Sequence, residues 1–178
     1  MLARSACLAV KAIPFAGLTP DRLLLLSAEV NLHRRVAYHP NVVTLHRAIK
    51  TEAVLFLVLD LIPGPDLFDQ IVTHDRYARD DGLITAVFAQ IVDAVAACHK
   101  NGFAHRDLKP ENILCEQDGT RVFLADFGLA TTDRTSKDWA TGSGFYMYVS
   151  PAAVPSPATP VGTLTISSHP LVLCQVAW

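Results

Sequence analysis

The sequence predicts an α+β fold, with three strands and one helix in the first part of the chain and a more helical part after it. Three short runs, around 8–13, 42–48 and 54–62, carry the apolar clustering or alternation of strands. One apolar stripe over 83–100 repeats every three to four residues, which is the period of a buried helix.

The first strand, over 8–13, is followed by signals for the start of a helix. Thr19-Pro20-Asp21 supplies an N-cap, a proline at the first helical position and an early acidic residue. These signals predict a helix over about 20–36, which His39-Pro40-Asn41 ends. The apolar stripe of this helix consists of Leu24, Ala28, Leu32 and Val36.

Two strands and a short helix come next. The runs 42–48 and 54–62 flank the polar turn 49–52, so they predict two neighbouring strands. Pro63-Gly64-Pro65 breaks the second of them, and 66–73 has the pattern of a short helix.

A long helix and a hairpin complete the predicted elements. The helix over 83–100 carries a broad apolar face, which implies deep burial. A hairpin is predicted over 113–125, because the turn pair Asp118-Gly119 separates two short apolar runs.

The composition changes sharply after Asp138. The remaining forty residues contain no Asp, Glu, Lys or Arg, and five prolines lie between Pro151 and Pro170. The segment has no helical period and no convincing strand pairing, so we expect 148–178 to be a disordered or adventitious tail, such as a gene-model artefact.

Bulk composition narrows the class of protein. With 51% hydrophobic and 18% charged residues the chain suits a globular core, and a formal net charge of −2 argues against an electrostatic nucleic-acid binder. No apolar run approaches the roughly 20 residues that cross a membrane, so no membrane partner is expected. Four cysteines without metal-binding spacing suggest reduced thiols in a cytoplasmic or nuclear protein: Cys7, Cys98, Cys115 and Cys174.

Two polar stretches at the ends of the predicted hairpin carry the chemistry. FAHRDLKPENIL covers 103–114 and LADFGLA covers 124–130. Asn112 and Asp126 offer the oxygen ligands that magnesium prefers, and Lys109 can neutralise charge on a transferring phosphoryl group. Asp107 can position a hydroxyl and accept its proton. Taken alone, such a charged loop is more often a solvated surface than an active site.

The order and spacing of these residues resemble those of eukaryotic protein kinases. His105-Arg106-Asp107-Leu108-Lys109-Pro110-Glu111-Asn112 matches the catalytic loop of that family, and Asp126-Phe127-Gly128 matches its metal-binding loop. The resemblance implies that Asp107 is the catalytic base, Lys109 faces the phosphate, and Asn112 and Asp126 bind magnesium. Lysine two positions after Asp107 is typical of serine/threonine kinases.

Weaker resemblances extend upstream and imply the nucleotide contacts. Ala9-Val10-Lys11 is similar to the third-strand lysine motif, so Lys11 would hold the α- and β-phosphates of ATP with Glu29 as its ion-pair partner. Residues 60–62 resemble the hinge, where backbone groups of Asp60 and Ile62 would bond the adenine.

Two further contacts with ATP are implied by the same resemblance. Asp66 would lie near the ribose, and Leu114 would cover the adenine ring opposite Ala9. The remaining histidines, His33 among them, share no ligand spacing and are expected to be satisfied core or surface residues.

The resemblance implies a protein-kinase-like two-lobe fold over 1–147, with a small lobe over about 1–62 and a large lobe over about 63–147. We expect this fold to be incomplete, because no glycine-rich hairpin precedes Lys11 and the large lobe ends at the activation segment. The wording around the activation segment is similar to fungal kinases of the meiosis- and nutrient-regulating type.

The implied function is a serine/threonine kinase that uses ATP and magnesium to phosphorylate a protein substrate. Two alternatives stay open: a non-catalytic, pseudokinase-like fragment that binds nucleotide or protein, and a fragment without a cellular role.

Overall fold

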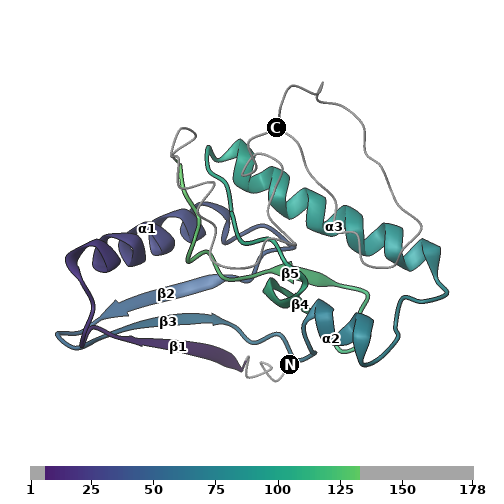
Figure 1. Cartoon of the computed structure of the whole chain (residues 1–178), viewed down its shortest axis with the longest axis horizontal. Coiled ribbons are helices and arrows are strands. Elements are labelled where there is room, and N and C mark those ends of the chain that lie inside the picture. Colours follow the sequence, from purple (N-terminus) through teal and green to yellow (C-terminus); the bar gives the residue numbers. More distant parts are fainter. Residues whose placement is uncertain (1–6, 133–178) are drawn as a thin grey trace, which may run out of the picture.

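The computed structural model describes residues 7–132, which form a strand-rich half and a helix-rich half (Figure 1). The predicted α+β class is confirmed. The predicted tail over 148–178 lies outside the described residues. In chain order the elements are β1 (Leu8–Pro14), α1 (Pro20–Val36), β2 (Leu45–Lys50), β3 (Val54–Asp60), α2 (Leu67–Val72), α3 (Asp81–Lys100), the 3₁₀ turn η1 (Pro110–Asn112), β4 (Ile113–Cys115) and β5 (Val122–Leu124).

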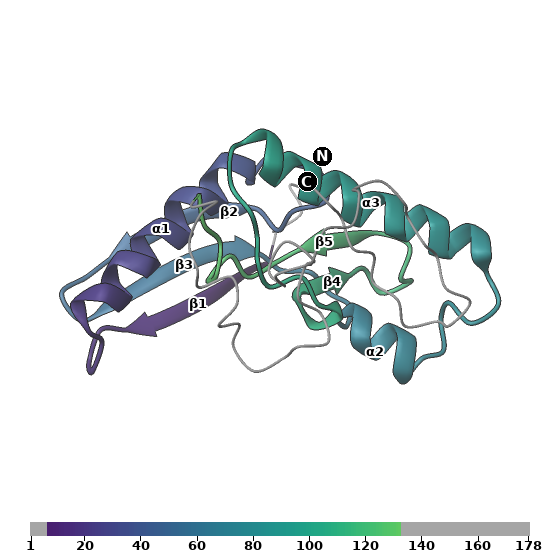
Figure 2. The same cartoon turned by 45° about the horizontal axis from the view of Figure 1, so that its top comes forward.

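The first half is an antiparallel sheet in the order β1-β3-β2 with α1 packed beside it (Figure 2). The register places Lys11 opposite Leu57 in the centre of the β1–β3 pair. Thr19 caps α1 as predicted, because its hydroxyl accepts a hydrogen bond from the Arg22 N–H at 3.3 Å. A core cluster joins α1 to the sheet: Val30, Ala37, Leu45, Leu55 and Leu57.

The second strand begins at Leu45, three residues later than predicted. The residues before it are held by the other half instead: Val43 N–H donates to Leu124 O at 3.0 Å, and Val42 pairs with Leu124 in an isolated parallel bridge. Their apolar pattern is thus satisfied by contact with β5 rather than by the sheet.

The second half is built on α3 and the β4–β5 hairpin. Asp80 caps α3 by accepting from Leu83 N–H at 2.9 Å, so the helix starts at Asp81, two residues before its predicted start. Gln90 ties the helix to the hairpin, since its side chain donates to Thr120 O at 2.8 Å and accepts from Val122 N–H at 3.1 Å.

A larger core cluster fills this half and also includes Leu32 and Val36 of α1. One helix therefore contributes to both clusters, which couples the position of α1 to the helix-rich half. The limits of the two expected lobes, 1–62 and 63–147, stay predictions.

Among the described residues, α3 is long and apolar enough by length and composition to cross a membrane. The sequence was not expected to contain such a helix, because no unbroken apolar run approaches the length of a membrane span. A core helix passes the same test, and five side chains of α3 are buried in the protein: Val87, Ile91, Ala94, Val95 and Cys98.

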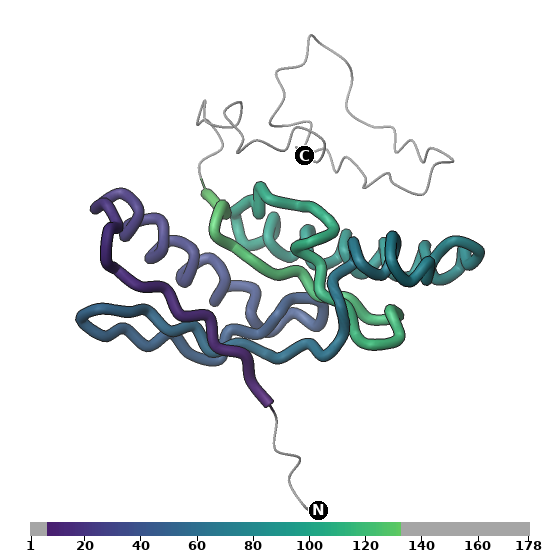
Figure 3. The backbone as a smooth tube through the Cα atoms, turned by 60° about the horizontal axis from the view of Figure 1, so that its bottom comes forward, coloured from purple at the N-terminus to yellow at the C-terminus, as the bar shows by residue number. Residues whose placement is uncertain are grey.

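The connection from β3 to α2 runs closely past the hairpin (Figure 3). Cys115 N–H donates to Pro65 O at 3.0 Å, and Asp66 pairs with Leu114 in an isolated bridge. Gly64 lies at the closest approach, because a Cβ there would meet the Cys115 carbonyl oxygen and would lie 2.6 Å from Glu116 C. These are backbone atoms, which cannot swing aside as a flexible side chain can.

We therefore expect Gly64→Ala to lower the free energy of unfolding by about 3 kcal/mol, at the upper end of typical overpacking costs. Gly82→Ala is the matched control, because a Cβ there meets only Asp80 Oδ1 at 3.4 Å and alanine favours the helix. Urea denaturation of both variants checks this. Equal stability of the two variants would contradict the close approach at Gly64.

Candidate active site

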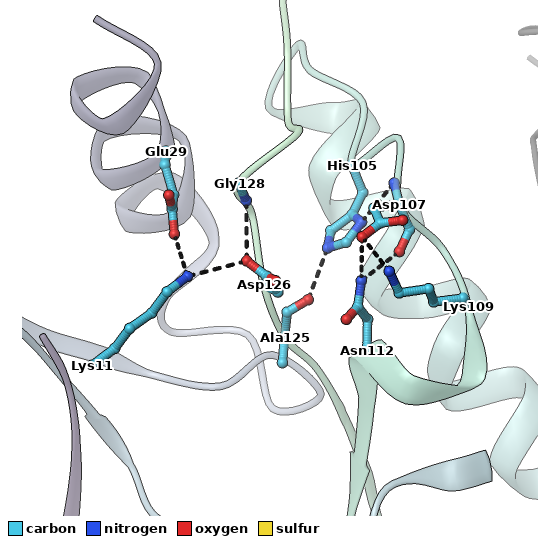
Figure 4. A network of polar contacts seen from close by, with 9 residues as sticks. All are labelled: Lys11, Glu29, His105, Asp107, Lys109, Asn112, Ala125, Asp126 and Gly128. Carbon is cyan, nitrogen blue, oxygen red and sulfur yellow. Dashed lines mark hydrogen bonds and ion pairs between the residues drawn. The ribbon is translucent and has the colours of Figure 1, made fainter. Parts of the chain in front are cut away.

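Lys11 brings three elements together. Its ammonium lies 3.0 Å from Glu29 Oε1 on α1 and 3.3 Å from Asp126 Oδ1 after β5 (Figure 4). Glu29 is buried, whereas the side chains of Lys11 and Asp126 are 43% and 50% exposed. The structure thus places Glu29 beside Lys11, as the resemblance implies, and adds Asp126 to the pair.

This arrangement keeps Lys11 and Asp126 charged at neutral pH. Partial burial acts to lower the pKa of Lys11, but Glu29 and Asp126 outweigh it and raise that pKa. Partial burial acts to raise the pKa of Asp126, but Lys11 and the Gly128 N–H hold it below its usual value. A cation flanked by two carboxylates is suited to an anionic ligand with its own bound cation.

A second cluster forms around the carboxylate of Asp107. Asp107 Oδ2 accepts from Lys109 Nζ and from Asn112 Nδ2, both at 2.8 Å, and Asn112 Nδ2 also lies 2.8 Å from Asp107 O. η1 positions Asn112 here, directly before β4. The three residues predicted to be catalytic are therefore in mutual contact.

His105 connects the two clusters. Its Nε2 donates to Ala125 O at 3.0 Å, and its Nδ1 accepts from Asp107 N–H at 3.3 Å. The ring also packs edge-on against Phe127, with centroids 4.9 Å apart. One buried side chain thus fixes the backbone next to both Asp107 and Asp126.

The backbone is unusual beside both acids. Arg106 has φ +68° and Asp126 has φ +58°, which is the left-handed region that non-glycine residues seldom adopt. Such conformations concentrate at functional sites, where surrounding contacts hold them.

The oxygen donors fit a magnesium ion bound together with phosphate groups. Asn112 points its amide nitrogen at Asp107, which leaves the amide oxygen to bind a cation, and Asp126 supplies a carboxylate. Within residues 7–132 no group of three or more His, Cys, Asp or Glu could hold a metal. Magnesium commonly takes only one or two protein ligands and completes its shell with phosphates and water, so this pair suffices.

The other predicted nucleotide contacts lie around the β3–α2 connection. The Asp60 carboxylate lies 2.6 Å from His46 Nε2 and accepts from Thr44 N–H at 3.3 Å, and the Asp60 N–H donates to Thr44 O at 3.1 Å, so these groups are already engaged within the sheet half. Asp66 caps α2 by accepting from Asp69 N–H at 2.9 Å. Ile62 and Leu114 are half-buried.

His33 packs beside the site as a satisfied core histidine, in agreement with the expectation from the sequence. Its ring is buried and stacked on Phe127, with centroids 4.4 Å apart. His33 lies four residues after Glu29, so both side chains share one face of α1.

Acid is expected to destabilise the fold through His105. Burial lowers the pKa of His105 to about 4, against the 6.5 that is usual for histidine. Between these values the unfolded chain binds a proton that the folded chain excludes, so stability is full above pH 6.5 and falls as pH drops toward 4. The expected loss is about 3 kcal/mol. Urea denaturation at pH 6.5, 5.5 and 4.5 measures it.

His105→Gln is the control for this pH dependence, because glutamine keeps an amide donor for Ala125 O but does not titrate. Its slope over the same range is expected to be shallower, with a remainder from His33, whose pKa burial also lowers. Identical slopes in the two proteins would contradict the assignment to His105.

Comparison with known proteins gives the family. Residues 3–164, most of the chain, match the sequence model of the protein kinase domain. The match supports the resemblance drawn from the catalytic and metal-binding loops.

Three curated proteins illustrate what this chain is similar to. The fission yeast (Schizosaccharomyces pombe) protein "Negative regulator of sexual conjugation and meiosis" is 47% identical over 139 residues, covering 78% of this chain and 30% of the relative. A Caenorhabditis elegans calcium/calmodulin-dependent protein kinase type II is 41% identical over 128 residues, covering 71% and 17%. The Saccharomyces cerevisiae serine/threonine-protein kinase VHS1 is 41% identical over 120 residues, covering 67% and 26%. The chain spans less than a third of the length of each of these relatives.

Proposed function

This chain belongs to the eukaryotic serine/threonine protein kinase family, and we propose that it transfers the γ-phosphoryl group of Mg-ATP to serine or threonine hydroxyls of a protein substrate. The observation that carries the proposal is the convergence of the Lys11–Glu29–Asp126 cluster and the Asp107–Lys109–Asn112 cluster, joined through His105.

Asp107 is proposed to accept the proton of the attacking hydroxyl. Its carboxylate is held by two donors, Lys109 and Asn112, so it is oriented before substrate arrives. The Lys109 ammonium, whose pKa the hydrogen bond with Asp107 raises, stays charged and can neutralise the phosphoryl oxygens during transfer.

Lys11 is proposed to bind the α- and β-phosphates, with Glu29 holding its ammonium in place. Asp126 and Asn112 are proposed to hold magnesium, which supplies charge neutralisation for the phosphates when bound. Backbone groups of Asp60 and Ile62, the Asp66 side chain and the apolar side chain of Leu114 are proposed to hold adenosine.

The test is incubation of the full chain with Mg-ATP and a library of serine- and threonine-containing peptides, with phosphopeptides identified by mass spectrometry. We expect EDTA to abolish the phosphorylation. Asp126 and Asn112 are proposed to hold magnesium, and they cannot take over its role at the phosphates when it is removed. Stabilisation by Mg-ATP against thermal unfolding without phosphotransfer would instead support the pseudokinase-like alternative.

A cytoplasmic or nuclear location is also proposed. Cys7, Cys98 and Cys115 carry free thiols, as expected in a reducing compartment. Burial raises the pKa of Cys98 and of Cys115 to about 12, so both are expected to stay protonated and unreactive.

A further inference from the structure

An irregularity in β2 places His46 beside the end of β3. The pairing of the two strands shifts between Leu45 and Arg47, so His46 is an extra residue in the strand. Such a bulge re-aims the side chain that it inserts, and bulges are frequent next to functional sites. Here the His46 Nε2 lies 2.6 Å from Asp60 Oδ1. A carboxylate oxygen only accepts, so Nε2 carries the proton of this hydrogen bond.

Asp60 is the last residue of β3, and the neighbouring strands hold it from both sides. Thr44 N–H donates to Asp60 Oδ2 at 3.3 Å, and the Asp60 N–H donates to Thr44 O at 3.1 Å. On its other side Asp60 pairs with Leu8 of β1. Partial burial acts to raise the pKa of Asp60, but hydrogen bonds from Thr44 and His46 hold it below its usual value. The carboxylate is therefore charged and accepts from both partners.

The segment after Asp60 leads from the sheet to the helix-rich half (Figure 1). It is anchored at its far end, because Cys115 N–H donates to Pro65 O at 3.0 Å. The path of residues 61–64 between the two anchors therefore depends on how Asp60 is held where the sheet ends. Ile62, whose backbone is proposed above to bind adenine, lies in this segment.

We infer that His46 is a positioning residue for the adenine base, because through Asp60 it sets where the segment 60–62 leaves the sheet. The inference rests on the proposed function and deepens it by adding a residue that governs recognition of the base. In this role His46 acts through the Asp60 carboxylate and not through contact with the nucleotide.

The size of the effect follows from the exposure of the pair. The side chains of His46 and Asp60 are 40% and 35% exposed, so solvent screens their interaction. A hydrogen bond to a charged group is nevertheless stronger than one between neutral groups. Loss of the imidazole is therefore expected to weaken the binding of adenine compounds about 3- to 10-fold, rather than to abolish it.

The experiment measures dissociation constants by calorimetry for Mg-ATP, adenosine and magnesium tripolyphosphate. Adenosine carries the base without phosphates, and tripolyphosphate carries phosphates without a base. In His46→Leu we expect the affinities for Mg-ATP and adenosine to fall about 3- to 10-fold, and that for tripolyphosphate to stay within about twofold. General damage to the fold would weaken all three ligands alike.

Two further variants complete the comparison. His46→Gln keeps an N–H donor for Asp60 and is expected to recover most of the loss. Arg47→Gln is the matched control, because Arg47 is the next residue of β2 and is also exposed. It is expected to bind all three ligands as the wild type does.

A double-mutant cycle tests whether His46 acts through Asp60. Asp60→Ala removes the acceptor of both Thr44 and His46, so it is expected to weaken adenosine binding by itself. Adding His46→Leu to it should then cause little further loss, since the interaction is already gone. Losses that simply add would show that His46 acts by another route and would overturn the inference.

Kinetics separate this role from catalysis. In His46→Leu the KM for Mg-ATP is expected to rise about 3- to 10-fold with kcat within about twofold, because the Asp107 cluster is unchanged. A wild-type chain that binds adenosine but transfers no phosphoryl group would refute the proposed function, and the dissociation constants would still decide the role of His46.

The inference is overturned if His46→Leu weakens adenosine and tripolyphosphate equally, or if it matches Arg47→Gln with all three ligands. His46 belongs to neither core cluster, so these variants are expected to fold. Should His46→Leu fail to fold, Asp60→Ala decides: adenosine binding equal to that of the wild type would overturn the inference.

Discussion

Replacement of Asp107 by asparagine is expected to lower kcat for peptide phosphorylation about 100- to 10,000-fold, which is the usual contribution of a positioned general base. Asparagine keeps the shape of the side chain but cannot accept the hydroxyl proton. Its amide nitrogen would also face two donors, Lys109 Nζ and Asn112 Nδ2, which now lie 2.8 Å from the carboxylate. Steady-state kinetics with peptide and Mg-ATP measure the loss.

The fold is expected to survive this change, because the Asp107 side chain belongs to neither core cluster. Affinity for Mg-ATP, read from the shift in melting temperature, should change less than about threefold, since Lys11, Asn112 and Asp126 remain. Asp93→Asn is the matched control: this carboxylate is 69% exposed on α3 and lies 3.9 Å from His39 Nε2. Activity that persists in Asp107→Asn cannot come from the proposed site.

The parts of this site that could be predicted from sequence depend on local pattern or on fixed spacing. Thr19-Pro20 predicted the start of α1, and Asp118-Gly119 predicted the turn between β4 and β5. Family motifs then identified Lys11, Glu29, Asp107, Lys109, Asn112 and Asp126, which the structure places in two adjoining clusters.

What sequence reasoning missed depends on contacts between distant segments. The late start of β2 follows from hydrogen bonding of Val43 to Leu124, eighty-one residues later, which no local pattern encodes. The stacking of His33 on Phe127 likewise joins segments that are far apart in the sequence. Helical spacing from Glu29 indicated only a shared face, and a buried histidine on such a face is ordinarily structural.

The backbone conformation at two site positions could not be predicted from the sequence either. A positive φ is expected at glycine, and the sequence has Arg106 and Asp126 at these positions. The backbone beside them is held by two hydrogen bonds of His105, a local one from Asp107 N–H and one to Ala125 O, twenty residues away. The contacts of the Asp60 side chain are a similar case, because its partners His46 and Thr44 lie on a neighbouring segment.

Asp126→Asn is expected to weaken the binding of magnesium at the nucleotide. The variant loses one of the two carboxylates beside Lys11 and the only charged ligand proposed for the metal. We expect kcat/KM for Mg-ATP to fall about 100- to 1,000-fold, comparable to the removal of one group that stabilises transition-state charge. The magnesium concentration for half-maximal activity should rise about 10- to 100-fold.

Thermal unfolding separates metal binding from catalysis in this variant. Wild-type protein should be stabilised more by ATP with magnesium than by ATP with EDTA, and in Asp126→Asn the two shifts should become nearly equal. Lys11 still pairs with Glu29 at 3.0 Å, so the phosphates keep their cationic partner and some stabilisation by ATP alone should remain. Asp93→Asn again controls for loss of a carboxylate. In Asp126→Asn only Asn112 remains of the two proposed protein ligands, so magnesium should bind more weakly. If the variant needs no more magnesium than the wild type, the metal binds elsewhere.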